Sequence, residues 1–354
     1  MRKSTKLSSL ITAALLLLNP LTTPIVHAAG APLVLRFATD AGHLNVNVPL
    51  VGPASVDIDW GDSTSSHVDL ADGERLFKTH TYASAGTTDV SITGSLAGLG
   101  RNMAGFPYSW WGYTATDYAD RLTAVVSWGD VGLLSLWGAF ADASNLIDIP
   151  SSIPSTVYET AFAFANATAI NDPDISAWDV SHVQNMSHMF NGATAFNQNL
   201  NSWDTSQLSS MYGMFSRASS YNQPMSNWDV SQVNDFSQVF SDASSFNQPL
   251  NDWDVSKSIG FYAMFQSTSF DQPLDKWDVS NSQTFTNMFL GSDFNQPLNM
   301  WDVGKAEYFN WMFYGTPFNQ PLFNWNMTGA LSLSGMFYYT PFDQDITNWD
   351  VSTV

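Results

Sequence analysis

The sequence contains no cysteine. This absence excludes disulfide bonds, thiolate chemistry and metal sites with sulfur ligands, so packing and hydrogen bonds must hold the fold together. Charged residues are scarce as well, at 12% of 354 residues, which is about half of the usual share. Asn, Gln, Ser and Thr must therefore supply most of the polar surface, which suits a secreted protein.

Positive charge is the scarcest kind. The chain has 12 Lys and Arg residues against 32 Asp and Glu residues, which gives a formal net charge of −20. The negative field of such a chain repels the phosphates of nucleic acids and the head groups of an anionic membrane. We therefore expect no nucleic-acid partner.

Long apolar runs are missing apart from a short one near the N-terminus. Basic residues (Arg2, Lys3 and Lys6) precede the apolar stretch 10–18, and small residues follow at 26–28. This pattern predicts a secretory signal peptide over residues 1–29, too short to span a membrane, and no membrane insertion after its cleavage. The sequence carries no lipidated cysteine, sorting motif or C-terminal apolar segment. We therefore expect a secreted or cell-surface protein without a visible anchor.

Residues 30–95 show a β pattern. Apolar residues alternate over 56–60 and end in Trp60-Gly61-Asp62-Ser63, and His80-Thr81-Tyr82 follows. This order resembles the PKD-type immunoglobulin-like domain, which implies a small β-sandwich over residues 30–95. Residues 96–120 are rich in Gly and aromatic residues and are predicted to be a linker, which either plugs the first turn of the following repeats or forms a binding loop.

The rest of the chain, residues 121–354, is a tandem repeat. Its tryptophans are spaced by 25 residues and later by 24, at Trp178, Trp203, Trp228, Trp253, Trp277, Trp301, Trp325 and Trp349. Regular copies fill residues 171–354, and residues 121–170 hold degenerate ones, with Trp128 two periods before Trp178. Such a period predicts one structural unit stacked many times, with atypical turns at the end of the array.

The most repeated letters within a copy are interpreted as structural. Phe stands twelve residues after each of the first seven of these Trp residues, at Phe190, Phe215, Phe240, Phe265, Phe289, Phe313 and Phe337. Asp follows Trp in all but one copy, and the Asp and Ser before a short Val-x-x-Met segment are typical of caps on a helical turn. Asn-Gln pairs suit amide ladders between turns. A catalytic or calcium-binding row of Asp residues is the alternative.

The repeat phrase resembles a known family. Residues 246–256 read Phe-Asn-Gln-Pro-Leu-Asn-x-Trp-Asp-Val-Ser, which is similar to the repeat of BspA-like leucine-rich-repeat surface proteins and of mycoplasma lipoproteins. The resemblance implies a leucine-rich-repeat-like solenoid, with one short parallel strand in each turn and short helical turns opposite. It also implies a bacterial surface protein concerned with adhesion, and it carries over no ligand.

No catalytic motif is present in the sequence. The histidines after residue 29 (His43, His67, His80, His182 and His188) form no zinc-protease pair, and nucleophile elbows, phosphate loops and dinucleotide motifs are missing. We expect a protein that is not an enzyme and that uses no cofactor and no metal. A carbohydrate-active enzyme is the alternative, and it would need a deviant, buried pair of carboxylates.

Binding residues are expected where the repeat varies. The last turns carry extra aromatic residues at positions that are small or polar in earlier turns, namely Tyr308, Trp311, Tyr314, Phe323, Tyr338 and Tyr339. Rings among Asn, Asp and Gln suit a protein or glycan partner on another cell or matrix. Alternatively these rings cover an exposed end or pack on further turns. A separate alternative for the whole chain is a surface spacer or a self-assembling layer component.

The last copy ends two residues before the sequence stops. Two interpretations follow: the sequence is a fragment of a longer one, or its last turn is an open edge for another chain.

Overall fold

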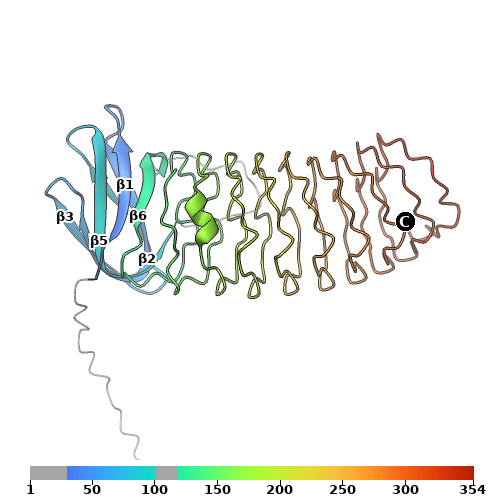
Figure 1. Cartoon of the computed structure of the whole chain (residues 1–354), viewed down its shortest axis with the longest axis horizontal. Helices are drawn as coiled ribbons and strands as arrows, with labels where there is room; N and C mark the ends of the chain where they lie inside the picture. The colour runs from blue at the N-terminus through green and yellow to red at the C-terminus, as the bar shows by residue number, and fades with distance from the viewer. Residues whose placement is uncertain (1–29, 101–118) are drawn as a thin grey trace, which may run out of the picture.

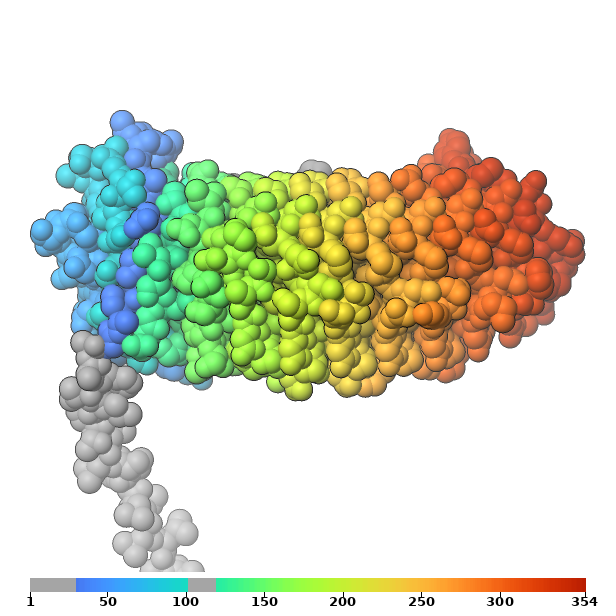
Figure 2. Space-filling view, in the orientation of Figure 1, coloured from blue at the N-terminus to red at the C-terminus, as the bar shows by residue number. Residues whose placement is uncertain are grey.

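The computed structural model describes residues 30–100 and 119–354 (Figure 1). A β-sheet lies at the N-terminal end, and residues 128–354 form a row of irregular turns stacked upon it, here termed the coil stack. The predicted signal peptide, residues 1–29, and residues 101–118 of the predicted linker lie outside the described residues. Figure 2 shows the sheet and the coil stack as one elongated body.

Six strands form the sheet: β1 (Leu33–Thr39), β2 (Asn45–Asp59), β3 (Ser65–Leu70), β4 (Arg75–Thr81), β5 (Gly86–Leu99) and β6 (Leu122–Ser127). Their order is β3-β2-β5-β1-β6, β4 pairs with the first half of β2, and every pairing is antiparallel. Alternate residues face inward, as the buried Leu33, Leu35 and Phe37 of β1 show. The sheet therefore has one apolar face and one polar face.

The predicted β-sandwich over residues 30–95 is wrong, because all six strands belong to a single sheet. β5 continues through residues 96–99 of the predicted linker, and β6 takes residues 122–127, which the repeat pattern had placed in the first degenerate turn. The apolar face needs no second sheet to cover it. Leu35 and Phe37 line the same small cavity as Ala139 and Phe140 of the coil stack, so both parts share one core.

The coil stack begins on the edge of the sheet. The N–H of Val125 on β6 donates to the carbonyl of Asp148 over 2.9 Å, and the N–H of Leu134 donates to the carbonyl of Ala97 on β5 over 2.8 Å. A short 3-10 helix, η1 (Ala119–Arg121), leads into β6. These bonds cover a strand edge that would otherwise be open to other chains.

Backbone hydrogen bonds within the coil stack alternate between two directions. The N–H groups of Met186, His188 and Phe190 donate to carbonyls of the next turn over 2.8 to 2.9 Å. The N–H groups in between, such as those of Met189 and Asn191, donate to carbonyls three residues earlier in their own turn. The same alternation recurs down the stack, so each turn is a run of overlapping β-turns bonded sideways to its neighbour.

The predicted leucine-rich-repeat-like solenoid, with parallel strands and helical turns, is therefore wrong. In the described part of the coil stack the turns carry only isolated parallel bridges, and the one helix there is the short 3-10 helix η2 (Pro173–Ala177). Two positions in each turn, ten and fourteen residues after the tryptophan, have a left-handed backbone, with His188 (φ 56°) and Gly192 (φ 71°) as the first regular pair. A left-handed residue interrupts both a helix and a strand.

The repeated aromatic residues form columns along the core. Ring centroids of successive Phe residues from Phe164 to Phe337 lie 5.6 to 5.9 Å apart and nearly parallel. Each repeat tryptophan from Trp178 to Trp349 donates its indole N–H to a carbonyl of the preceding turn over 2.8 to 3.2 Å. The predicted structural residues are buried as expected, although Phe337 and Trp349 in the last turn are only partly buried.

Candidate functional site

The aspartate that follows each tryptophan caps a turn of the backbone. Oδ1 of Asp179 accepts hydrogen bonds from the N–H of Ser181 over 3.1 Å and from its hydroxyl over 2.7 Å. Both bonds favour the ionised carboxylate and lower the pKa of Asp179. The repeated carboxylates accept backbone N–H groups, as caps do. The predicted cap on a helical turn is wrong, because each carboxylate forms an Asx turn before a β-turn.

The Asn-Gln pairs form the ladder that the sequence predicts. Oδ1 of Asn222 accepts the N–H of Asn247 over 3.0 Å and the side-chain amide of Gln248 over 2.9 Å, both from the following turn. The pattern repeats from Asn171 to Gln344, and Asp271 takes the place of Asn in one turn. Each rung satisfies a backbone donor, so the ladder is a structural device.

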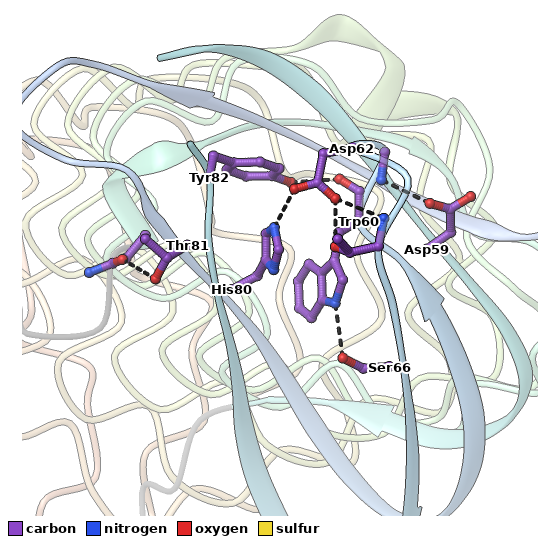
Figure 3. A network of polar contacts seen from close by, with 10 residues as sticks. Asp59, Trp60, Asp62, Ser66, His80, Thr81 and Tyr82 are labelled. Carbon is purple, nitrogen blue, oxygen red and sulfur yellow. Dashed lines mark hydrogen bonds and ion pairs between the residues drawn. The ribbon is translucent and has the colours of Figure 1, made fainter. Parts of the chain in front are cut away.

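The Trp-Gly-Asp and His-Thr-Tyr segments meet at one corner of the sheet (Figure 3). Nε2 of His80 lies 2.8 Å from Oδ2 of Asp62, and its ring stacks on Trp60 with centroids 4.8 Å apart. The hydroxyl of Tyr82 donates to the carbonyl of Trp60 over 2.9 Å, and the indole of Trp60 donates to Ser66 over 3.0 Å. The contacts of His80 and Tyr82 therefore hold the β2–β3 turn against the end of β4.

The pKa shifts of Asp62 and Tyr82 at this corner fit a structural role. Hydrogen bonds from the Thr64 hydroxyl, first, and from His80 lower the pKa of Asp62. Burial raises the pKa of Tyr82 to about 12. Neither shift creates an acid or a base poised near neutral pH, as general acid–base catalysis would need.

The six predicted partner-binding residues do not form one patch. Tyr314, Tyr338 and Tyr339 make a cluster, in which the ring centroids lie 5.6 Å (314 to 338), 5.5 Å (314 to 339) and 4.2 Å (338 to 339) apart. Tyr338 and Tyr339 are 56% and 70% exposed. A hydrogen bond with Tyr339 is the main cause that raises the pKa of Tyr338. We call these three residues the tyrosine cluster.

Trp311 stands on the same turn as Tyr314 and is 46% exposed. Its indole lies over the next turn, where a Cβ added to Gly335 would come within 2.1 Å of the Trp311 Cδ1 atom. Tyr308 and Phe323 are exposed too, but among residues 119–354 no ring contact joins either of them to the tyrosine cluster. The structure thus brings together three of the six residues and places Trp311 on the adjoining segment.

A second aromatic row near the sheet has no counterpart in the sequence predictions. The guanidinium of Arg75 on β4 lies 4.6 Å from the ring of Trp137, and Trp137 contacts Phe162 edge to face at 6.2 Å. Phe162 stacks on His188 at 4.6 Å, and His188 contacts Tyr212 at 5.0 Å. Trp137 and Tyr212 are each followed by a glycine, but Phe162 and His188 are not, so no shared signal in the sequence marks the row.

His188 is a buried member of this row. His188 is only 8% exposed, and its Nδ1 lies 3.2 Å from the side-chain amide of Asn191. Burial lowers the pKa of His188 to about 4, so the imidazole is neutral at physiological pH.

Metal sites and membrane-spanning helices are both absent from the described residues. No group of three or more His, Asp or Glu residues there is arranged to hold a metal ion. Within the same ranges, no helix has the length and apolar character needed to cross a membrane.

Comparison with protein-family models gives a match to the repeats. The family model described as "Mycoplasma protein of unknown function, DUF285" matches residues 158–272 and again residues 261–354, which together span more than half of the chain. No curated protein and no solved structure matches the chain.

Proposed function

The chain belongs to the mycoplasma family of unknown function DUF285, and from this premise we propose that it is a non-catalytic repeat protein of the cell surface or the secreted medium. Its task is to bind a partner, either a protein or a glycan on another cell or matrix. The surface rich in Asn, Gln, Ser and Asp supports a place outside the cell.

The observation that carries partner binding is the tyrosine cluster with Trp311 beside it. Side chains at these positions of earlier turns are smaller, for example Gly291 and Gly315 in the column of Tyr339. Large rings that remain exposed beside polar side chains are the kind of surface that forms binding hot spots, because they bury much area at little cost in conformational entropy.

The state of the carboxylates supports a non-catalytic role. Hydrogen bonds from Ser lower the pKa values of Asp179, Asp254 and Asp278. A glycosidase would need one carboxylic acid with a raised pKa opposite an ionised partner. These three aspartates have the opposite shift, and their carboxylates accept hydrogen bonds from the backbone.

The test is a glycan and host-protein array probed with the purified mature chain. We expect a discrete set of ligands, whose signal falls when Trp311 and Tyr338 are replaced by alanine. A Tyr158→Ala variant is the matched control, since Tyr158 is 50% exposed on a distant turn. Unchanged array signals in the Trp311→Ala and Tyr338→Ala variants would sink the proposal.

A structural spacer is the second candidate, and the continuous core favours it. One cluster of buried residues runs from Leu33 to Met336 without a break, which makes the chain a stiff rod (Figure 2). A self-assembling layer would show light scattering that rises more steeply than the protein concentration. A monomeric binder would show scattering that is only proportional to concentration.

A further inference from the structure

The tyrosine cluster has a geometry that suits covalent chemistry as well as binding. Tyr314 belongs to one turn, and Tyr338 and Tyr339 belong to the next. Both ring centroids of the later turn lie within 5.6 Å of the Tyr314 ring. We propose that the tyrosine cluster is an oxidative cross-linking site, at which a dityrosine bond joins Tyr314 to Tyr338 or Tyr339.

The reaction needs a one-electron oxidant, which we take to be a haem peroxidase using hydrogen peroxide. Each of two phenols loses one electron and its hydroxyl proton, which gives two phenoxyl radicals. The radicals couple through ring carbons that are ortho to the phenol oxygens. Each of these ortho carbons then loses its hydrogen as a proton, and each oxygen regains a proton. Overall two tyrosines lose two hydrogen atoms, and one hydrogen peroxide is reduced to two waters.

Access and proximity both favour this site over the other tyrosines. Tyr338 and Tyr339 are 56% and 70% exposed, so a diffusing oxidant or a radical mediator reaches them. The ring centroids of Tyr338 and Tyr339 lie 5.6 Å and 5.5 Å from that of Tyr314, which holds ring carbons of the two turns close together. Tyr158, Tyr262 and Tyr308 are exposed as well, but within the described ranges they have no ring contact with another tyrosine.

The bond would fasten one turn to the next. Phe337 and Trp349 in the later turn are only partly buried, so this turn has fewer packing contacts to hold it than the turns before. The chain has no cysteine with which to form a disulfide. A carbon–carbon bond between turns supplies the covalent constraint that other secreted proteins obtain from disulfides.

The experiment treats the full mature chain, at low concentration, with a haem peroxidase and hydrogen peroxide. Dityrosine fluorescence follows the reaction, and mass spectrometry of the digested product locates the bond. We expect emission from monomeric protein, a product lighter by two hydrogen atoms, and a link between the peptides that carry Tyr314 and Tyr338 or Tyr339. The Tyr314→Phe variant should lose this link, whereas Tyr158→Phe should keep it.

The phenylalanine variants retain the ring and therefore keep the fold and the aromatic surface. Loss of the cross-link in Tyr314→Phe with partner binding intact separates this proposal from the proposed function. Three results would overturn it: full emission in Tyr314→Phe, cross-links found only between different chains, or a bond found only between the neighbours Tyr338 and Tyr339.

Discussion

Tyr221 is the one hydroxyl in a column of phenylalanine rings. It is fully buried between Phe196 and Phe246, with ring centroids 6.0 and 6.2 Å away. Within the described structure its hydroxyl has no hydrogen-bond partner. A buried unsatisfied hydroxyl costs about 1–3 kcal/mol, so we expect Tyr221→Phe to raise the free energy of unfolding by about that amount.

Denaturant titration of the Tyr221→Phe variant measures this gain. The matched control is Phe246→Tyr, which places a second hydroxyl in the same column and should destabilise the protein. A Tyr221→Phe variant that is less stable than the wild type would show that the hydroxyl has a partner in solution.

His188 predicts a pH dependence of stability. Burial lowers its pKa in the folded state to about 4, from 6.5 for the exposed side chain. Between these values the unfolded chain binds a proton that the folded chain does not, so stability falls as the pH drops from 6.5 towards 4 and loses no more from this group below 4. The expected loss is about 3 kcal/mol.

Thermal unfolding across this pH range tests the effect, with His188→Gln as control because Gln238 occupies the same column. The variant should lack the part of the decline that lies above pH 4. Asp179 and Asp254 lose their contribution only at lower pH, since hydrogen bonds from Ser lower their pKa from 3.8 in the folded chain. Equal declines in both proteins between pH 6.5 and pH 4 would contradict the assignment to His188.

At the scale of the element, the amide ladder predicts which substitutions a rung tolerates. Oδ1 of Asn247 accepts the N–H of Asp271 and the side-chain amide of Gln272, both over 3.0 Å. Asn247→Leu leaves both donors without their acceptor and should cost about 1–3 kcal/mol. Asn247→Asp should be nearly neutral, because Asp271 fills the same role for Asn295 and Gln296.

Denaturant titration of the two Asn247 variants, side by side, decides the matter. Equal stability of Asn247→Leu and Asn247→Asp would mean that water replaces the rung without loss and that the ladder does not hold the turns together.

Two glycines of the left-handed columns separate backbone strain from side-chain crowding. Gly335 (φ 64°) and Gly315 (φ 70°) have similar backbones. A Cβ at Gly335 would lie 2.1 Å from Trp311, whereas the nearest atom to a Cβ at Gly315 is 3.9 Å away. Both alanine variants should lose about 1 kcal/mol from the backbone, and Gly335→Ala should lose more because the indole must move.

Unfolding of the double variant Trp311→Ala Gly335→Ala completes this comparison. Removing the indole should recover the extra loss of Gly335→Ala, which a double-mutant cycle measures as a coupling. Additive losses would show that Trp311 does not rest on Gly335.

The sequence predicts the elements unevenly, for reasons that individual residues show. The period and the core positions can be read from the tryptophan and phenylalanine columns, because side chains such as Trp253 and Phe265 must recur wherever a core continues. The path of the backbone cannot be read in the same way. Left-handed positions are occupied by His188, Gln238 and Trp311 as well as by Gly, so no composition signal marks them.

The candidate site was predictable only in part. Extra rings that break the repeat pointed to Tyr314, Tyr338 and Tyr339, which the structure does bring together. Phe323 breaks the repeat equally well but lies in another part of the turn, since spacing within a turn of unknown path does not fix a direction. The row from Arg75 to Tyr212 joins the sheet to the coil stack. Because Arg75 lies outside the repeats, this contact leaves no periodic signal in the sequence.

At the scale of the whole molecule, the structure is a long body with one core and few basic groups. Its repeated letters hold the backbone: Trp and Phe fill the core, Asp caps turns, and Asn and Gln form a ladder. We propose that the side chains that depart from the repeat meet other molecules, and that partner binding takes place at the tyrosine cluster and Trp311, on the last turns of the stack.

The most direct test is the affinity of the mature chain for the ligand that the array identifies. Titration calorimetry should compare the wild type with the double variant Trp311→Ala Tyr338→Ala and with Tyr158→Ala. The account predicts binding that the double variant weakens at least about tenfold, as the loss of two hot-spot rings would, and that Tyr158→Ala leaves unchanged. Equal affinity of the wild type and the double variant would contradict it.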